Sequence, residues 1–159
     1  MRIDVTRQPT VVRQGSSDGA PLGTSGRARL KILTQPGDDS GYALIEATHP
    51  VGEPRIRDHL HLRHEETFVV LEGQYEVRLG PDVVWVSAGD YVFVPRGTPH
   101  TYRNAGPVPA RVLNVISPPD GVQLLAELGA LATSSVDETL LAEIHSRHAA
   151  SLAEPLPGW

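Results

Sequence analysis

The stretch from about residue 56 to residue 118 is a succession of short β-favouring runs separated by turn residues. Glycine and proline punctuate it, as at Gly73, Gly80–Pro81 and Gly106–Pro107. Short strands at this spacing, with turn signals between them, predict an antiparallel sandwich or barrel. The expected strands are Ile56–Arg63, Glu66–Leu71, Gln74–Leu79, Val83–Val86, Tyr91–Pro95, His100–Asn104 and Arg111–Ser117.

The flanking segments have different patterns. Residues 1–27 are polar and rich in turn residues, so we expect an arm or edge strand that could contact a second subunit. Two further strand-like runs, Ala28–Thr34 and Tyr42–Thr48, begin a barrel that we place at residues 28–118. Leucines at helical spacing then predict two short helices within residues 119–159, the second preceded by a capping box at Ser135–Glu138.

Composition narrows the functional classes. Hydrophobic residues make up 40% of the 159 residues, which suits one packed domain. The net charge of −5 and the absence of any run of lysine or arginine argue against nucleic acid and anionic membranes as partners. The chain has no cysteine, so a metal would need imidazole and carboxylate ligands. The first residues lack an apolar leader, and we expect a cytoplasmic protein.

The stretch from His59 to Gly73 contains the most informative pattern. Residues two apart on a strand point to the same face, so His59 and His61 project side by side, as two imidazoles sharing one metal ion must. A turn at residues 63–65 would bring Glu66 back beside the pair on the neighbouring strand. Glu65 is the alternative carboxylate, but Glu66 shares the face of the apolar Phe68 and is favoured.

Two ordered motifs in this chain resemble those of the cupin superfamily. Residues 59–73 match the first, HxH-x4-E-x6-G, and residues 89–104 match the second, G-x5-P-x-G-x2-H-x3-N. The 15 residues between Gly73 and Gly89 also suit the family's short inter-motif segment. The wider pattern is similar to that of small quercetinase-like bacterial cupins, in which two helices follow the barrel.

The resemblance implies an all-β fold, a double-stranded β-helix or jelly-roll barrel, followed by two short C-terminal helices. It implies one divalent transition metal ion held by His59, His61, Glu66 and His100. That ion could be iron, manganese, nickel, copper, cobalt or zinc, because this ligand set suits several of them. Glu66 could be a ligand or a nearby base. A homodimer is expected, since cupins commonly pair through strands or sheets.

Other residues have weaker signals. By alternation Arg57 would share the face of His59, and we hypothesise that it binds an acidic group of the substrate. Tyr102, on the face of His100, could line the cavity, although core packing is the commoner role of such a residue. Asn104 is expected to pin the end of its strand by hydrogen bonds.

Three further histidines are expected to lie outside the site. His64 is out of phase with the His59 and His61 pair, which predicts a solvated or turn-bonded ring. His145 and His148 fall on the last predicted helix, where exposed histidines are ordinary.

Three functions fit the sequence. The first is a metal-dependent dioxygenase that takes an enol-, catechol-, flavonol- or polyketide-like small molecule, with Glu66, Arg57 and Tyr102 as candidate catalytic residues. The second uses the same centre without oxygen, as a cyclase, isomerase or lyase. The third is a small-molecule-binding cupin without turnover.

Overall fold

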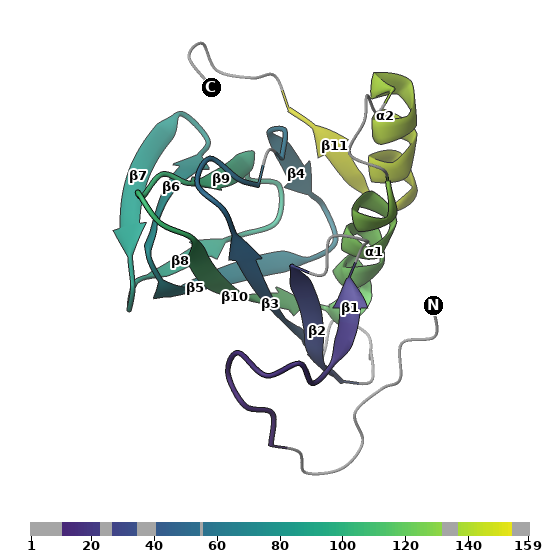
Figure 1. Ribbon diagram of the computed structural model, residues 1–159. Coiled ribbons are helices and arrows are strands. Elements are labelled where there is room, and N and C mark those ends of the chain that lie inside the picture. Colours follow the sequence, from purple (N-terminus) through teal and green to yellow (C-terminus); the bar gives the residue numbers. More distant parts are fainter. Residues whose placement is uncertain (1–10, 23–26, 35–40, 55, 132–136, 154–159) are drawn as a thin grey trace.

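The computed structural model describes residues 11–22, 27–34, 41–54, 56–131 and 137–153. Their strands form two antiparallel sheets whose apolar faces pack against each other (Figure 1). Across the large sheet the order is β1 (Ala20–Leu22), β2 (Ala28–Leu33), β3 (Ala43–His49), β10 (Ala110–Ser117), β5 (Glu65–Glu72) and β8 (Tyr91–Val94). The small sheet contains β11 (Ala150–Leu152), β4 (His59–His61), β9 (His100–Asn104), β6 (Gln74–Leu79) and β7 (Asp82–Ser87).

Alternation of buried and half-buried side chains explains the sheets. Strands β3 and β10 alternate strictly along their whole length, as strands with one face on a core do. The barrel core combines Phe68 and Val112 of the large sheet with Tyr75 and Val77 of the small one. The predicted all-β architecture is therefore confirmed.

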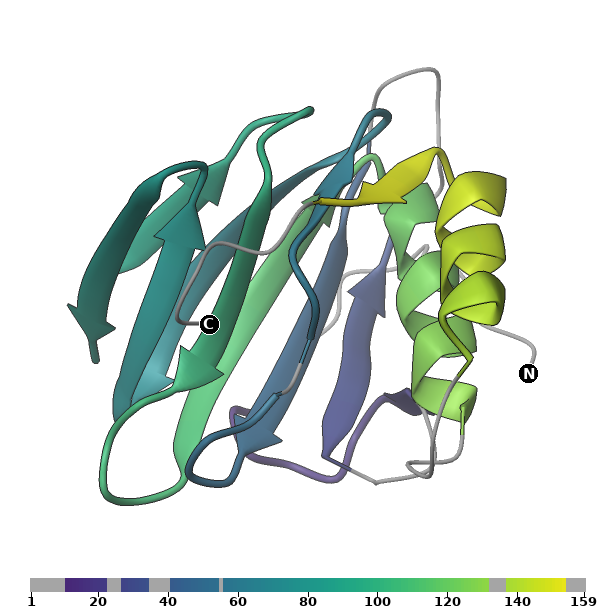
Figure 2. The ribbon, with the colours of Figure 1, turned by 90° about the horizontal axis from the view of Figure 1, so that it is seen from above.

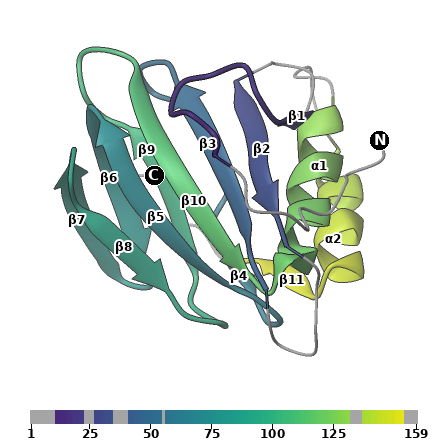
Figure 3. The same cartoon turned by 90° about the horizontal axis from the view of Figure 1, so that it is seen from below.

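The two predicted helices are also present. A short 3-10 turn, η1 (Pro119–Gly121), leads into α1 (Val122–Ala130), and α2 (Glu138–Arg147) follows. Figure 2 shows both helices at one side of the strands, and Figure 3 places α1 beside β1 and β2. Val122 and Leu125 pack against apolar residues of β1–β3 and β10. Among the described residues, neither helix is long and apolar enough to cross a membrane.

The C-terminal segment contributes a strand that the sequence did not predict. After α2 the chain forms β11, which pairs antiparallel with β4, so that Ala150 lies opposite His61 and Leu152 opposite His59. Leu124 of α1, Ile144 of α2 and Ala150 of β11 form one small core. Segment 119–153 is thus joined to the barrel both by strand pairing and by packing.

Several predicted boundaries need correction. The run Ile56–Arg63 gives a strand only at His59–His61, since residues 56–58 are irregular and the chain bends at residues 62–63. Helix α2 begins at Glu138, and its cap is Asp137, whose side chain accepts a hydrogen bond from the Thr139 amide. Ser135, the predicted cap, lies outside the described residues. Within segment 1–27, β1 is an edge strand of the large sheet, as expected.

Candidate metal centre

Two strands of the small sheet hold three histidines together. His59 and His61 project from β4 on one face, and both are buried. Strand β9 pairs with β4 so that His100 lies directly opposite His59. The ring centroids are 4.7 Å apart for His59 and His61 and 4.5 Å apart for His59 and His100. Donor nitrogens of all three lie within 4.8 Å of one another, which is close enough to share one ion.

The fourth predicted ligand reaches this cluster from the large sheet. Glu66 is buried on the inner face of β5, whereas Glu65 points to the outer face and is half-buried. One carboxylate oxygen of Glu66, Oε1, is 3.4 Å from His61 Nε2, and the other, Oε2, is 3.7 Å from His100 Nε2. Asn114 of β10 donates a 3.3 Å hydrogen bond to Oε2. The structure therefore brings together all four residues of the predicted ligand set.

The hydrogen bonds of the rings fit a metal ion. His59 Nδ1 is 2.8 Å from the Arg57 carbonyl and His100 Nδ1 is 2.9 Å from the Thr98 carbonyl. A carbonyl only accepts, so each Nδ1 carries the hydrogen and each Nε2 has a free lone pair. This is the arrangement typical of metal-binding histidines. His100 Nε2 and both ring nitrogens of His61 are buried without a hydrogen-bond partner, which is costly unless something binds there.

The pKa values of His59 and His61 also fit a metal ion. Burial lowers the pKa of His59 to about 4 and that of His61 to about 2, so both rings are neutral near pH 7 and available as ligands. Burial alone would raise the pKa of Glu66, but the surrounding imidazoles outweigh it and hold that pKa well below its usual range. Burial would lower the pKa of His100, but the neighbouring Glu66 carboxylate raises it, so the two groups form an ion pair when the ring is protonated. The cluster thus contains an ionised carboxylate among nitrogen donors.

A cavity of about 340 Å³ opens beside the cluster, between the barrel and α1. His59, Glu66 and His100 form part of its wall, and apolar side chains form most of the rest. These include Ile45, Ala47, Val112, Leu125, Leu128 and Leu131. The cavity suits a small, largely apolar molecule with one polar group directed at the cluster.

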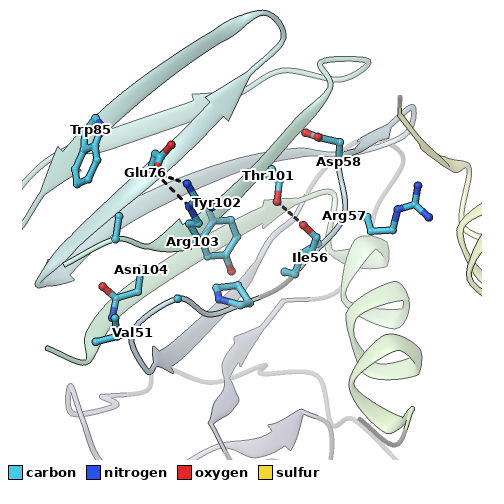
Figure 4. A pocket seen from close by; sticks show the side chains of 13 residues that line it. Val51, Ile56, Arg57, Asp58, Glu76, Trp85, Thr101, Tyr102, Arg103 and Asn104 are labelled. Carbon is cyan, nitrogen blue, oxygen red and sulfur yellow. Dashed lines mark hydrogen bonds and ion pairs between the residues drawn. The ribbon is translucent and has the colours of Figure 1, made fainter. Parts of the chain in front are cut away.

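Tyr102 lies where this cavity meets a second, larger one. The second, which we call the outer groove, has a volume of about 840 Å³ and is lined by Trp85, Tyr102 and Arg103 among others (Figure 4). The outer groove contains none of the four predicted ligands. The ring of Tyr102 packs against Phe68, with centroids 4.8 Å apart, and burial raises the pKa of its phenol. Tyr102 therefore lines the cavity and packs in the core at once.

The structure does not bring the side chain of Arg57 to the cluster. Its guanidinium forms an ion pair with Glu138 of α2 and lies at the edge of the outer groove (Figure 4). Strand β4 begins only at His59, so the alternation used to place Arg57 does not extend back to it. Its position therefore gives no support to a contact with a molecule in the cavity.

For two of the three other histidines, the predicted environment was wrong. His64 is buried, with Nε2 3.6 Å from Glu66 Oε1 and its ring centroid 4.0 Å from that of His61, the two rings tilted by 32°. The bend at residues 62–63 resets the strand alternation, which is why the phase argument failed there. His145 is buried too, 5.9 Å from His59 between ring centroids, because the packing of α2 on β11 encloses it. His148 instead pairs with Glu127 of α1.

Asn104 behaves as predicted. Its side-chain amide donates to the carbonyls of His49 and Val108, and its oxygen accepts from the Gly106 amide. Two of these bonds hold the turn after β9, and the bond to His49 joins the end of β9 to the end of β3. The role of Asn104 is therefore to fix the end of the strand that presents His100.

Comparison with known proteins identifies the family. A family model for the cupin domain matches residues 46–116, which include all four predicted ligands. Protein SchB of Streptomyces halstedii is 32% identical over 117 residues, covering 74% of this chain and 81% of SchB. The chain belongs to the cupin family. This cupin is also 33% identical over 88 residues to quercetin 2,3-dioxygenase of Bacillus subtilis.

Coverage of some relatives is partial. The match spans 55% of this cupin but 26% of the Bacillus subtilis dioxygenase. A Methanocaldococcus jannaschii protein without an assigned function is 36% identical over 77 residues, which are 61% of its length.

Solved structures agree on the fold. A Klebsiella pneumoniae protein with a double-stranded β-helix domain aligns with a TM-score of 0.50 at 24% identity, covering 68% of this cupin and 91% of that chain. A Bacillus halodurans protein aligns with a TM-score of 0.54 at 22% identity, covering 74% and 87% of the two chains. These likenesses show the double-stranded β-helix fold of the barrel.

Proposed function

We propose that this cupin is a metal-dependent dioxygenase that acts on a small, largely apolar molecule with an enol, catechol or flavonol group. The observation that carries the proposal is the position of Glu66, an ionised carboxylate at the wall of an apolar cavity and beside three histidines. The similarity to the Bacillus subtilis quercetin 2,3-dioxygenase, which covers 55% of this chain, supports a reaction with dioxygen.

His59, His61, His100 and Glu66 would hold the ion. A divalent transition metal bound there would supply a Lewis acid and, if it were iron or copper, a route for electrons. The rings of His59 and His100 are oriented for this by their bonds to backbone carbonyls.

The remaining steps belong to the side chains of the cavity. The apolar wall binds the carbon skeleton and excludes water from it. The low pKa of Glu66 makes it a weak base, so it would accept the proton only of an acidic hydroxyl, such as an enol or phenol beside a bound cation. The hydrogen bond from Asn114 keeps Oε2 of Glu66 in place. The deprotonated skeleton then reacts with dioxygen, and both oxygen atoms enter the products.

Oxygen uptake tests the proposal directly. Protein loaded with each candidate metal is given a panel of enols, catechols and flavonols in an oxygen electrode. We expect oxygen uptake with at least one combination of metal and substrate. In Glu66→Gln the rate should be lower by about 10²–10⁴-fold, because a positioned base contributes about that much. Glu65→Gln is the matched control, since Glu65 faces away from the cavity, and it should retain the rate.

Two results would reject this function. Product formed under strict anaerobiosis would show a cyclase, isomerase or lyase that uses the same carboxylate as a proton carrier. Absence of bound metal in gently purified protein and in metal titrations would instead favour a binding module.

A further inference from the structure

His64 occupies a position beside the cluster that the proposed ligand set does not use. Its side chain is 3% exposed, and its Nε2 is buried without any hydrogen-bond partner. That nitrogen is 3.6 Å from Glu66 Oε1. A buried polar atom without a partner is destabilising, so the arrangement indicates that something else binds there.

The donor atoms form two overlapping groups. His59, His61 and His100 make one, and His61, His64 and Glu66 make the other, with the donor atoms in each group lying within 4.8 Å of one another. The two oxygens of Glu66 are divided between them, because Oε1 faces His61 and His64 while Oε2 faces His100. Glu66 can therefore serve either group without leaving its place on β5.

His61 is the residue that the two groups share, and no hydrogen bond fixes its ring. His59 and His100 each fix Nδ1 on a backbone carbonyl, whereas both nitrogens of His61 are unpartnered. The His61 ring can thus present a nitrogen to either group.

The chain after the barrel makes room for the His64 ring. A Cβ added to Gly121 would lie 2.7 Å from His64 Cε1 and 2.8 Å from its Nδ1. Only glycine lets η1 approach this closely, so the fold holds the ring in its position between Gly121 and His61.

We propose that His64 is a fifth metal donor, which binds the ion together with His61 and Glu66 in a second arrangement that overlaps the first. The inference rests on the proposed function only in requiring that the centre binds a metal ion. It adds a donor that lies within the x4 segment of the first motif, between its second histidine and its glutamate.

Metal binding without substrate tests the proposal. Metal-free protein is titrated with Co²⁺, with calorimetry for the dissociation constant and visible absorption for the ligand geometry. In His100→Ala the first group is broken, and we expect weaker binding with a changed cobalt spectrum. Adding His64→Gln should then weaken binding at least tenfold further.

His145→Gln in the same His100→Ala background is the matched control. His145 is buried beside His59 but belongs to neither donor group, so binding should change less than twofold. Thermal unfolding of the metal-free variants checks that each is folded. Equal effects of His64→Gln and His145→Gln would overturn the proposal, because they would reflect packing alone, and so would complete loss of binding in His100→Ala.

Gly121→Ala is an independent test of whether the position of the His64 ring matters for metal binding. Its φ is in the helical region, so alanine fits the backbone, and the nearest atoms to its methyl group would all belong to the His64 ring. When Gly121→Ala is added to the His100→Ala variant, we expect weaker Co²⁺ binding. When it is added to the variant that also contains His64→Gln, we expect no further effect. If the wild-type protein bound no metal at all, the proposed function would be rejected together with the role of His64. If the wild type bound metal and His64→Gln had no specific effect, only the role of His64 would be rejected.

Discussion

Buried histidines in this protein have two distinct environments. In the candidate metal centre, ring nitrogens of His61, His64 and His100 lack hydrogen-bond partners. His49, at the end of β3, instead has Nδ1 2.9 Å from the Tyr75 hydroxyl and its ring edge against Tyr102. The difference arises because the Tyr75 hydroxyl gives His49 a hydrogen-bond partner within the protein. A buried, neutral imidazole with such a partner has a structural role. Since protonation of the ring opposes its burial, His49 makes the stability of the fold depend on pH.

We predict that His49 contributes to acid destabilisation of the metal-free protein. Burial lowers its pKa from 6.5 to about 4, so the folded state binds this proton more weakly than the unfolded chain does. The contribution of neutral His49 to the free energy of unfolding is complete above pH 6.5. It is lost as the pH falls toward 4, which costs about 3 kcal/mol for a pKa shift of this size. Urea unfolding from pH 7 to 4 should show a shallower pH dependence in His49→Gln. An unchanged slope would contradict the prediction.

At the scale of the element, β4 is the critical strand. It has only three residues, yet it presents two histidines because β9 pairs with one edge and β11 with the other. Neighbouring turns set the register of the strands that carry the rest of the site. Gly73 joins β5 to β6 with φ 79°, and a Cβ there would lie 2.6 Å from the Cβ of Ala110.

We predict that Gly73→Ala is more damaging than Gly80→Ala. Both glycines have positive φ, but nothing lies within 4 Å of a Cβ at Gly80. Alanine therefore carries backbone strain at both sites and a steric overlap only at Gly73, which should cost about 1–3 kcal/mol more. Chemical denaturation of the two variants measures the difference. Equal losses of stability would show that β10 moves aside freely.

At the scale of the molecule, the site lies between the barrel and the C-terminal segment. Leucines of α1 close one wall of the cavity, and the core of Leu124, Ile144 and Ala150 joins both helices to β11 and so to β4. The helices are thus part of the enclosure around the candidate metal centre.

We predict that weakening this junction destabilises the whole protein. Leu124 is 1% exposed, so Leu124→Ala should lower the free energy of unfolding by about 2–5 kcal/mol. Leu140→Ala, at a residue of α2 that is 38% exposed, should change it by no more than about 0.5 kcal/mol. Urea unfolding followed by circular dichroism gives both values. Similar small effects would mean that the barrel is stable without the segment.

The sequence by itself determined the strand-rich barrel, the two helices and the side-by-side projection of His59 and His61, because alternation along a strand is local. Spacing also selected Glu66 over Glu65. Only the tertiary structure decided the burial of His64 and His145, the ion pair of Arg57 with Glu138 and the pairing of β11 with β4. Each of those depends on segments far apart in the chain, and their contacts arise from packing, which no local pattern encodes.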